Sequence, residues 1–207
     1  LTDVRLQRLA KAFWPGPLTL LLPKKEIIPN IVTSGLANVA VRIPNHSLTL
    51  ELLKKINVPL AAPSANPFGY VSPTQPAHVN SQLGDKIAYI LDGGACEVGL
   101  ESTIVGIEED KVCVFRLGGL AIEEIEKVIG KTELRINNSS NPVSPGQLKS
   151  HYAPKKPLFM GDIKELIKKN KEKNIAIICF GNKTFEGKER LVFDLSKNKN
   201  LQEAAIN

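Results

Sequence analysis

Three short segments of this chain carry polar side chains that suit nucleotide chemistry, and one of them adds basic and aromatic side chains. Residues 144–154 read Ser-Pro-Gly-Gln-Leu-Lys-Ser-His-Tyr-Ala-Pro and include His151 and Tyr152. An ordinary linker is rich in Gly, Ser or charge and lacks such side chains, so this segment is a candidate for contact with a nucleotide. The other two segments are residues 62–66, Ala-Pro-Ser-Ala-Asn, and residues 101–105, Glu-Ser-Thr-Ile-Val.

The polar residues of the two upstream segments lie beside apolar stretches that favour strands. Ser64 and Asn66 follow the stretch 58–62, and ligands of open α/β sheets bind beyond the carboxyl ends of strands. Their side chains and backbone N–H groups could meet phosphate oxygens, although a Ser/Asn turn that closes on itself is an alternative. Ser102 begins another apolar stretch, where its hydroxyl could bind a carboxylate or phosphate, or cap the local backbone.

Two arginines lie in apolar surroundings and call for anionic partners. Arg42 stands within Val-Ala-Val-Arg-Ile-Pro, where a buried cation is costly unless it is paired. A guanidinium binds a carboxylate through two parallel hydrogen bonds, so Arg42 is a candidate ligand for a carboxylate, and an internal salt bridge is the alternative. Arg116 ends a predicted strand and could hold a phosphate. His151 and Tyr152 could cover a nucleotide if the connector folds back as a lid, or could simply dock the linker.

Several common catalytic motifs are missing from the sequence. There is no G-x-G-x-x-G, no G-x-x-x-x-G-K-[ST] and no G-x-S-x-G, which argues against the usual dinucleotide fold, a P-loop and a hydrolase nucleophile elbow. The three histidines are scattered, and the three cysteines form no C-x-x-C pair. The sequence therefore predicts neither a His- or Cys-based metal site nor a disulfide framework.

The spacing of apolar residues predicts alternating helices and strands that would position these side chains. We expect helices at residues 2–13, 47–56, 75–83, 121–129 and 162–169, and at the C-terminal end. We expect strands at residues 18–22, 38–43, 58–62, 87–91, 102–107, 112–117, 157–160, 175–180 and 191–195. The pattern divides the chain into a first domain (residues 1–131), a polar linker (132–156) and a second unit (157–207). In the second unit strands alternate with helices, which is typical of a parallel sheet.

Composition limits the classes of protein to which the chain can belong. The 207 residues are 43% hydrophobic and carry a formal net charge of +6, which favours a folded protein with anionic partners such as nucleotides or RNA, or simply a basic surface. Sparse cysteines, no signal peptide and no apolar run of about 18 residues predict a cytoplasmic protein that does not enter a membrane. Since the chain lacks an initiator Met and both ends fall in helical patterns, we expect the natural protein to extend further.

Seven separated motifs together resemble the L-threonylcarbamoyladenylate synthase family, in the form with two domains. The matching residues are 14–19, 39–44, 62–66, 72–74, 91–94, 101–105 and 115–118, and the linker 144–154 is similar to that of the two-domain form. The resemblance implies an α/β (α+β) fold. In it, a YrdC-like twisted mixed sheet with flanking helices is linked to a partial Rossmann-like α/β/α domain.

The resemblance also implies a nucleotidyltransferase reaction. L-Threonine and bicarbonate (or CO₂) would form a carbamate, which attacks the α-phosphate of ATP and releases pyrophosphate. A partner, a tRNA-modifying transferase, would then pass the threonylcarbamoyl group to adenosine in tRNA. The expected cofactor is Mg²⁺, held by the ATP phosphates and water, and no covalent nucleophile is expected.

Site residues follow from the same resemblance. Arg42, Ser102 and the backbone of Ala62 would bind L-threonine. The implied ATP ligands are Asn38, Ser64, Asn66, Arg116 and Tyr152.

The chain departs from the family pattern at several positions. Leu117 and Gly106 stand where the family usually has proline and aspartate, and Ala62 and Asn38 stand where threonine is common. The family's opening half-domain, with its Lys-x-Arg phosphate motif, has no counterpart in the sequence, so we expect the fragment alone to be weakly active or inactive.

Two other functions remain open at this point. The first is a YrdC-like module with weak RNA binding. It is disfavoured because the sequence shows no aromatic stacking platform. The second is a carbamoyl-transfer relative with another acceptor, which the linker and second domain disfavour.

Overall fold

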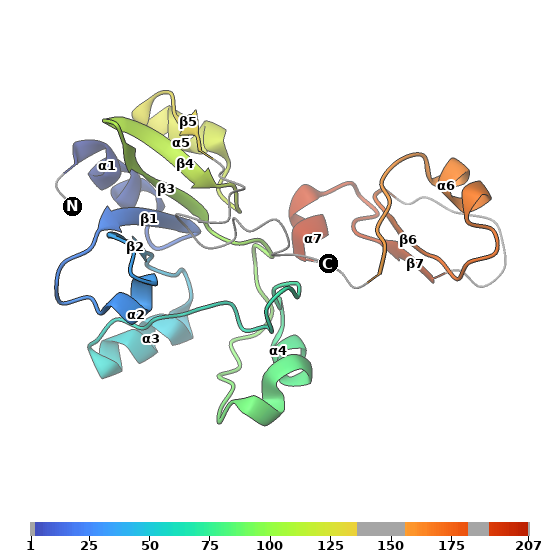
Figure 1. Cartoon of the computed structure of the whole chain (residues 1–207), viewed down its shortest axis with the longest axis horizontal. Helices are drawn as coiled ribbons and strands as arrows, with labels where there is room; N and C mark the ends of the chain where they lie inside the picture. Colours follow the sequence, from blue (N-terminus) through green and yellow to red (C-terminus); the bar gives the residue numbers. More distant parts are fainter. Residues whose placement is uncertain (1–2, 136–155, 182–190, 207) are drawn as a thin grey trace.

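The computed structural model describes residues 3–135, 156–181 and 191–206, and it divides into a larger N-terminal part and a smaller C-terminal part (Figure 1). The strands of the first part are β1 (Leu18–Pro23), β2 (Asn38–Val41), β3 (Thr103–Glu108), β4 (Lys111–Arg116) and β5 (Glu133–Leu134). Its helices are α1 (Val4–Phe13), α2 (Asn30–Thr33), α3 (Ser47–Ile56), α4 (Pro76–Leu83), the 3-10 turn η1 (Gly84–Lys86) and α5 (Ile122–Ile129).

The five strands form one mixed sheet in the order β2-β1-β3-β4-β5. β1 pairs in parallel with β3 and antiparallel with β2, and β4 pairs antiparallel with β3 and in parallel with β5. The predicted fold of a mixed sheet with flanking helices is therefore confirmed. Because β5 lies within the predicted linker, the sheet continues further along the chain than we expected.

The main core lies between the sheet and the helices α1 and α5, which pack against each other. Period-two alternation in the strands sends Leu18, Leu20 and Val105 to this face, and helical spacing brings Leu6 and Leu9 to meet them. The other face of the sheet carries a smaller buried cluster of Leu21, Ile104, Cys113 and Phe115. The sheet therefore has one well-covered face and one face with a thinner apolar layer.

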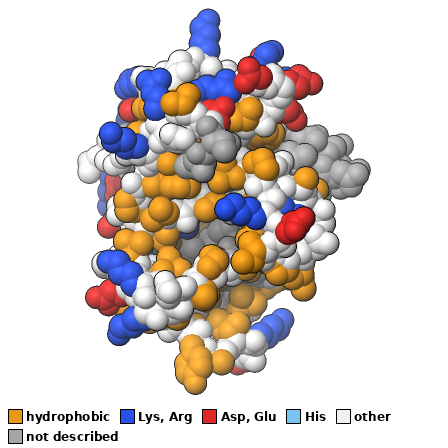
Figure 2. All heavy atoms as spheres, turned by 90° about the vertical axis from the view of Figure 1, so that its left-hand side faces the viewer, with side chains coloured by type: hydrophobic (Ala, Val, Ile, Leu, Met, Phe, Trp, Pro, Cys, Tyr) orange, Lys and Arg blue, Asp and Glu red, His pale blue; other side chains and the backbone are white. Residues whose placement is uncertain are grey.

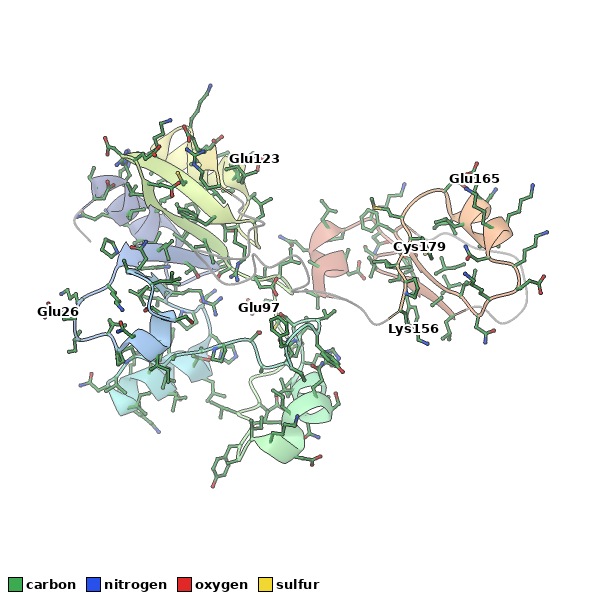
Figure 3. The ribbon with its side chains drawn as sticks, in the orientation of Figure 1. Glu26, Glu97, Glu123, Lys156, Glu165 and Cys179 are labelled. Atoms are coloured by element: carbon green, nitrogen blue, oxygen red, sulfur yellow. The ribbon has the colours of Figure 1, made fainter. Side chains whose placement is uncertain are left out.

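The C-terminal part contains two parallel strands, β6 (Ala176–Cys179) and β7 (Leu191–Asp194), with the helices α6 (Ile163–Lys169) and α7 (Leu201–Ile206). Cys179 is buried among the side chains of this part (Figure 3). Asp162 caps α6 by accepting the backbone N–H of Glu165 at 3.0 Å. The parallel pairing of β6 and β7 agrees with the alternation of strands and helices predicted from the sequence. The Rossmann-like description of this part stays a prediction.

Three predicted strands are wrong: residues 58–62, 87–91 and 157–160 have no strand structure. Their apolar side chains are largely exposed, including Leu60, Tyr89 and Met160. A strand forms only where a neighbouring strand accepts its backbone hydrogen bonds, and within the described ranges these segments have no such neighbour. Other hydrophobic side chains are spread over the side of the molecule where β2 and α2 lie (Figure 2).

The first helix begins at a carboxylate that is held in its charged form. Asp3 accepts the backbone N–H groups of Arg5 and Leu6, and its other oxygen pairs with the Arg5 guanidinium at 2.7 Å. The hydrogen bond from Arg5 is the largest cause that lowers the pKa of Asp3 to about 2. A folded-state pKa below the usual value means that this carboxylate stabilises the fold above about pH 4 and loses that effect as the pH falls toward 2.

We therefore expect Asp3→Ala to lower the free energy of unfolding by about 1 kcal/mol at neutral pH, the usual cost of losing a helix cap. The difference from the unchanged protein should shrink as the pH falls from 4 toward 2. Urea titrations at a series of pH values measure both quantities. Asp3→Asn is the control, because it keeps the capping oxygen without a titratable group. A deficit for Asp3→Ala that does not change with pH would contradict this account.

Candidate active site

Arg42 lies one residue beyond β2, at the end of the sheet where β1 begins. β1 and β2 pair antiparallel, and the continuation of their register places Arg42 across from Thr19. The Gly16 N–H donates to the Ile43 carbonyl at 2.9 Å, which keeps the chain after β2 beside the turn before β1. Arg42 is exposed, and no ion pair involves it within the described ranges. The alternative of an internal salt bridge is thus not supported in this part of the chain.

Ser102 lies immediately before β3, on the other side of β1, and is only 6% exposed. The next N–H, that of Thr103, donates to the Pro17 carbonyl at 3.0 Å, so the start of β3 is held against the turn before β1. The Ser102 hydroxyl oxygen lies 2.6 Å from the hydroxyl oxygen of Thr19. It therefore bonds to a neighbouring strand and does not simply cap its own backbone.

A break in the strand register directs Arg116 to the same place. β3 and β4 pair Val105 with Val114, but the next pair is Ile104 with Arg116, so Phe115 is an extra residue on β4. Such a bulge shifts the alternation of the strand by one residue. Without the bulge, Ile104 would face Phe115 and the arginine would point to the opposite side of the sheet.

Arg116 uses this position to bind Ser102. Its Nε and Nη2 donate to the Ser102 carbonyl at 3.0 and 2.9 Å, and Nη2 also donates to the Ser102 hydroxyl oxygen at 3.1 Å. The turn that follows β4 packs onto the same backbone, since a Cβ atom on Gly118 would lie 2.5 Å from the Ser102 carbonyl carbon. Only glycine fits this approach, which explains why Gly118 stands two residues after Arg116.

The loop that carries Ala62, Ser64 and Asn66 is bound to the loop that leads into Ser102. The Ser72 hydroxyl donates to the Glu101 carboxylate at 2.7 Å, and the Cys96 N–H donates to the Thr74 carbonyl at 2.8 Å. The loop 62–74 is thereby attached to the loop 92–101, which Glu97 marks in Figure 3. These contacts link the segment of Ala62, Ser64 and Asn66 to the end of the sheet that holds Arg42, Ser102 and Arg116.

Within the loop 62–74 the candidates differ in exposure. Ala62 and Ser64 are exposed, whereas Asn66 is half-buried. The Asn66 side-chain amide donates to the carbonyls of Pro67 and Tyr70 at 2.9 and 3.1 Å, so it shapes its own loop. Its Oδ1 is buried, with no hydrogen-bond partner within the described ranges, which leaves an acceptor on the inner side of the loop.

The structure does not bring every predicted residue together. Asn38 begins β2 and pairs with Pro23, so it lies at the opposite end of that strand from Arg42. Tyr152 and His151 lie outside the described residues. The described residues include no group of three or more His, Cys, Asp or Glu side chains that could hold a metal ion. None of their helices has the length and apolarity that crossing a membrane requires.

Sequence reasoning assigned no role to Thr19, which the structure places at the centre of this site. Thr19 is 7% exposed between the fully buried Leu18 and Leu20. A hydroxyl inside an otherwise apolar strand was the available signal, because a buried hydroxyl needs a hydrogen-bond partner.

Comparisons with known proteins bear on the whole chain. The family model described as "Telomere recombination" (Sua5/YciO/YrdC) matches residues 2–118, and the model described as "Threonylcarbamoyl-AMP synthase, C-terminal domain" matches residues 120–207. A threonylcarbamoyl-AMP synthase of Pyrococcus abyssi is 41% identical over 88% of this chain and 58% of its own length. The synthase of Bacillus subtilis is 43% identical over 74% of this chain and 46% of its own length.

A solved structure is similar along the entire chain. The crystal structure of P. abyssi Sua5 complexed with L-threonine matches with a TM-score of 0.89 and 38% identity, over 100% of this chain and 64% of that one. The chain thus spans about half to two thirds of the length of these relatives. The family match covers more than half of the chain and includes the strands β1 to β4, which establishes that this chain belongs to the Sua5/YciO/YrdC family.

Proposed function

We propose that this chain is part of a threonylcarbamoyl-AMP synthase. Its site for L-threonine would lie at the end of the sheet where Arg42 and Ser102 are found. The observation that carries the proposal is the convergence of these two residues on the turn before β1. It occurs in a fold that is similar, over the whole of this chain and 64% of the solved one, to the L-threonine complex of P. abyssi Sua5. A guanidinium and a hydroxyl at the same end of a sheet are suited to the carboxylate of an amino acid.

The proposed reaction joins three substrates without a covalent enzyme intermediate. L-Threonine and bicarbonate form a carbamate on the threonine nitrogen with loss of water, and a carbamate oxygen attacks the α-phosphorus of ATP. The bond between the α-phosphorus and the bridging oxygen breaks, and pyrophosphate leaves. The residues contribute by positioning the reactants and by balancing negative charge.

We propose different tasks for the two arginines because their surroundings differ. Arg42 is exposed and would bind the threonine carboxylate directly. Arg116 already donates to Ser102, so it would shape the threonine site, and its positive charge would balance the negative charge of the ATP phosphates. Ser64 and Asn66 of the loop 62–74 would bind the ATP phosphates. The backbone of Ala62 would complete the threonine site. Asn38 and Tyr152 would bind other parts of ATP.

Mg²⁺ would enter as part of the substrate MgATP. This ion keeps several waters and is usually bound through phosphates with one or two carboxylates. The acceptor of the threonylcarbamoyl group would be an adenosine of tRNA, reached through a separate transferase. That assignment makes the natural protein a cytosolic enzyme.

The proposal predicts pyrophosphate release that depends on both L-threonine and bicarbonate. We expect the natural full-length protein to release pyrophosphate from ATP and to form an adenylate of the mass of threonylcarbamoyl-AMP. The 207-residue chain should be much less active. Pyrophosphate assays and mass spectrometry measure the two products. If the full-length protein makes no adenylate with any amino acid, the proposed function is wrong, and tests of RNA binding and of other carbamoyl acceptors become the next step.

We also expect Arg42→Ala to weaken L-threonine binding by about 10- to 100-fold, since a hydrogen bond to a charged group contributes about 1.5–3 kcal/mol. ATP affinity and the melting temperature should change little, because Arg42 is exposed. Calorimetric titration of each ligand into the full-length protein tests this. Arg8→Ala is the matched control, because it removes an exposed positive charge from α1, on the other face of the sheet. Equal losses in both variants would show a general charge effect and contradict the assignment.

A further inference from the structure

The hydroxyl of Thr19 is an unusual group for the centre of a sheet. Its neighbours in β1, Leu18 and Leu20, are fully buried, and Thr19 itself is 7% exposed. Valine has nearly the same shape and would avoid the cost of burying a hydroxyl. The hydroxyl must therefore have a specific partner, and that partner is Ser102, at 2.6 Å between the two oxygens.

Counting protons and lone pairs shows what this contact does to Ser102. A serine hydroxyl has one proton to donate and two lone pairs to accept hydrogen bonds. Arg116 fills one lone pair, because its Nη2 is always a donor. If Thr19 donates to the second lone pair, Ser102 can act toward any further partner only as a donor.

A hydrogen bond donated by Ser102 to Thr19 would leave the Thr19 proton without an acceptor in the described part of the chain. If Ser102 donated to Thr19, the Thr19 proton would need another acceptor within a strand whose neighbouring side chains are apolar. No such acceptor is found within the described ranges, and an unpaired buried donor costs about 1–3 kcal/mol. With Thr19 as donor, the proton that finds no partner among the described residues belongs to Ser102, at the same end of the sheet as Arg42.

We infer that Thr19 is a positioning residue, which makes the Ser102 hydroxyl an obligate hydrogen-bond donor toward the carboxylate of the bound amino acid. This inference rests on the proposed function, because it takes L-threonine as the ligand. The continuation of the register between β1 and β2 places Arg42 opposite Thr19, on the side of β1 away from Ser102. A donor hydroxyl and a guanidinium would then approach one carboxylate from the two sides of β1. The arrangement selects an acceptor and disfavours any ligand that presents a donor to Ser102.

Substitution of Thr19 in the full-length protein tests the inference. We expect Thr19→Val to raise the dissociation constant for L-threonine about tenfold, and Thr19→Ser to restore it to within about twofold of the unchanged protein. The affinity for ATP should stay within about twofold in both. L-Threoninol, in which a hydroxymethyl group replaces the carboxylate, should bind weakly and equally to the unchanged protein and to Thr19→Val. Calorimetric titrations provide all of these constants.

A matched control separates positioning from general loss of stability. Thr103 is the next residue after Ser102, and its hydroxyl donates to the Leu120 carbonyl at 2.6 Å. Because side chains alternate along a strand, Thr103 faces away from Ser102. Thr103→Val should lower the melting temperature and leave the dissociation constant for L-threonine unchanged. An equal loss of threonine affinity in Thr103→Val and Thr19→Val would overturn the inference.

The double variant Thr19→Val/Ser102→Ala gives the decisive comparison. If Thr19 acts through Ser102, the double variant should bind L-threonine no more weakly than Ser102→Ala alone. Additive losses, or unchanged threonine binding by Thr19→Val, would overturn the inference while the proposed function stands. Coupling between the two substitutions should also appear in urea unfolding without any ligand, and its absence would overturn the inference independently. Failure of the unchanged protein to bind L-threonine would overturn the proposed function and the ligand named for Ser102.

Discussion

The hydrogen bonds from Arg116 to Ser102 hold the rest of the site in place. Ser102 is nearly inaccessible, and its carbonyl needs a donor that the sheet does not supply at that point. The Arg116 guanidinium supplies two N–H groups to that carbonyl and contacts the hydroxyl as well. The Gly119 N–H binds the preceding carbonyl of Glu101 at 2.8 Å. The start of β3 is thereby fixed to the end of β4, and the Ser102 hydroxyl has a defined position.

The two arginines of the site illustrate how surroundings decide the task of a side chain. Arg116 is committed to bonds within the protein, so most of its binding energy goes into structure. Arg42 lies past the end of its strand, at the same end of the sheet, and is exposed. An anionic ligand at this end would contact one exposed cation and one whose direction is already set by Ser102, which lowers the cost of organising the site.

The C-terminal part approaches the same region through α7. Gly99 has a positive φ of 73°, and a Cβ atom at that position would collide with the Ala205 carbonyl of α7. The loop that Gly99 belongs to leads directly into Glu101 and Ser102. A helix packed against this loop connects the second part of the chain with the residues that the proposed function places around L-threonine.

Local sequence signals determined the helices that begin at capping residues, such as α1 after Asp3 and α6 after Asp162, and the strands β1, β3 and β4 with their apolar alternation. They also pointed to Arg42, Ser102 and Arg116 as chemically unusual. Tertiary structure alone decided that residues 58–62 and 87–91 are not strands, because a strand depends on a neighbour that no local pattern specifies. It alone placed Phe115 in a bulge, and that one extra residue turns Arg116 toward Ser102 and Thr19. The direction of a side chain at a strand end depends on the register between strands, which is set by contacts distant in sequence.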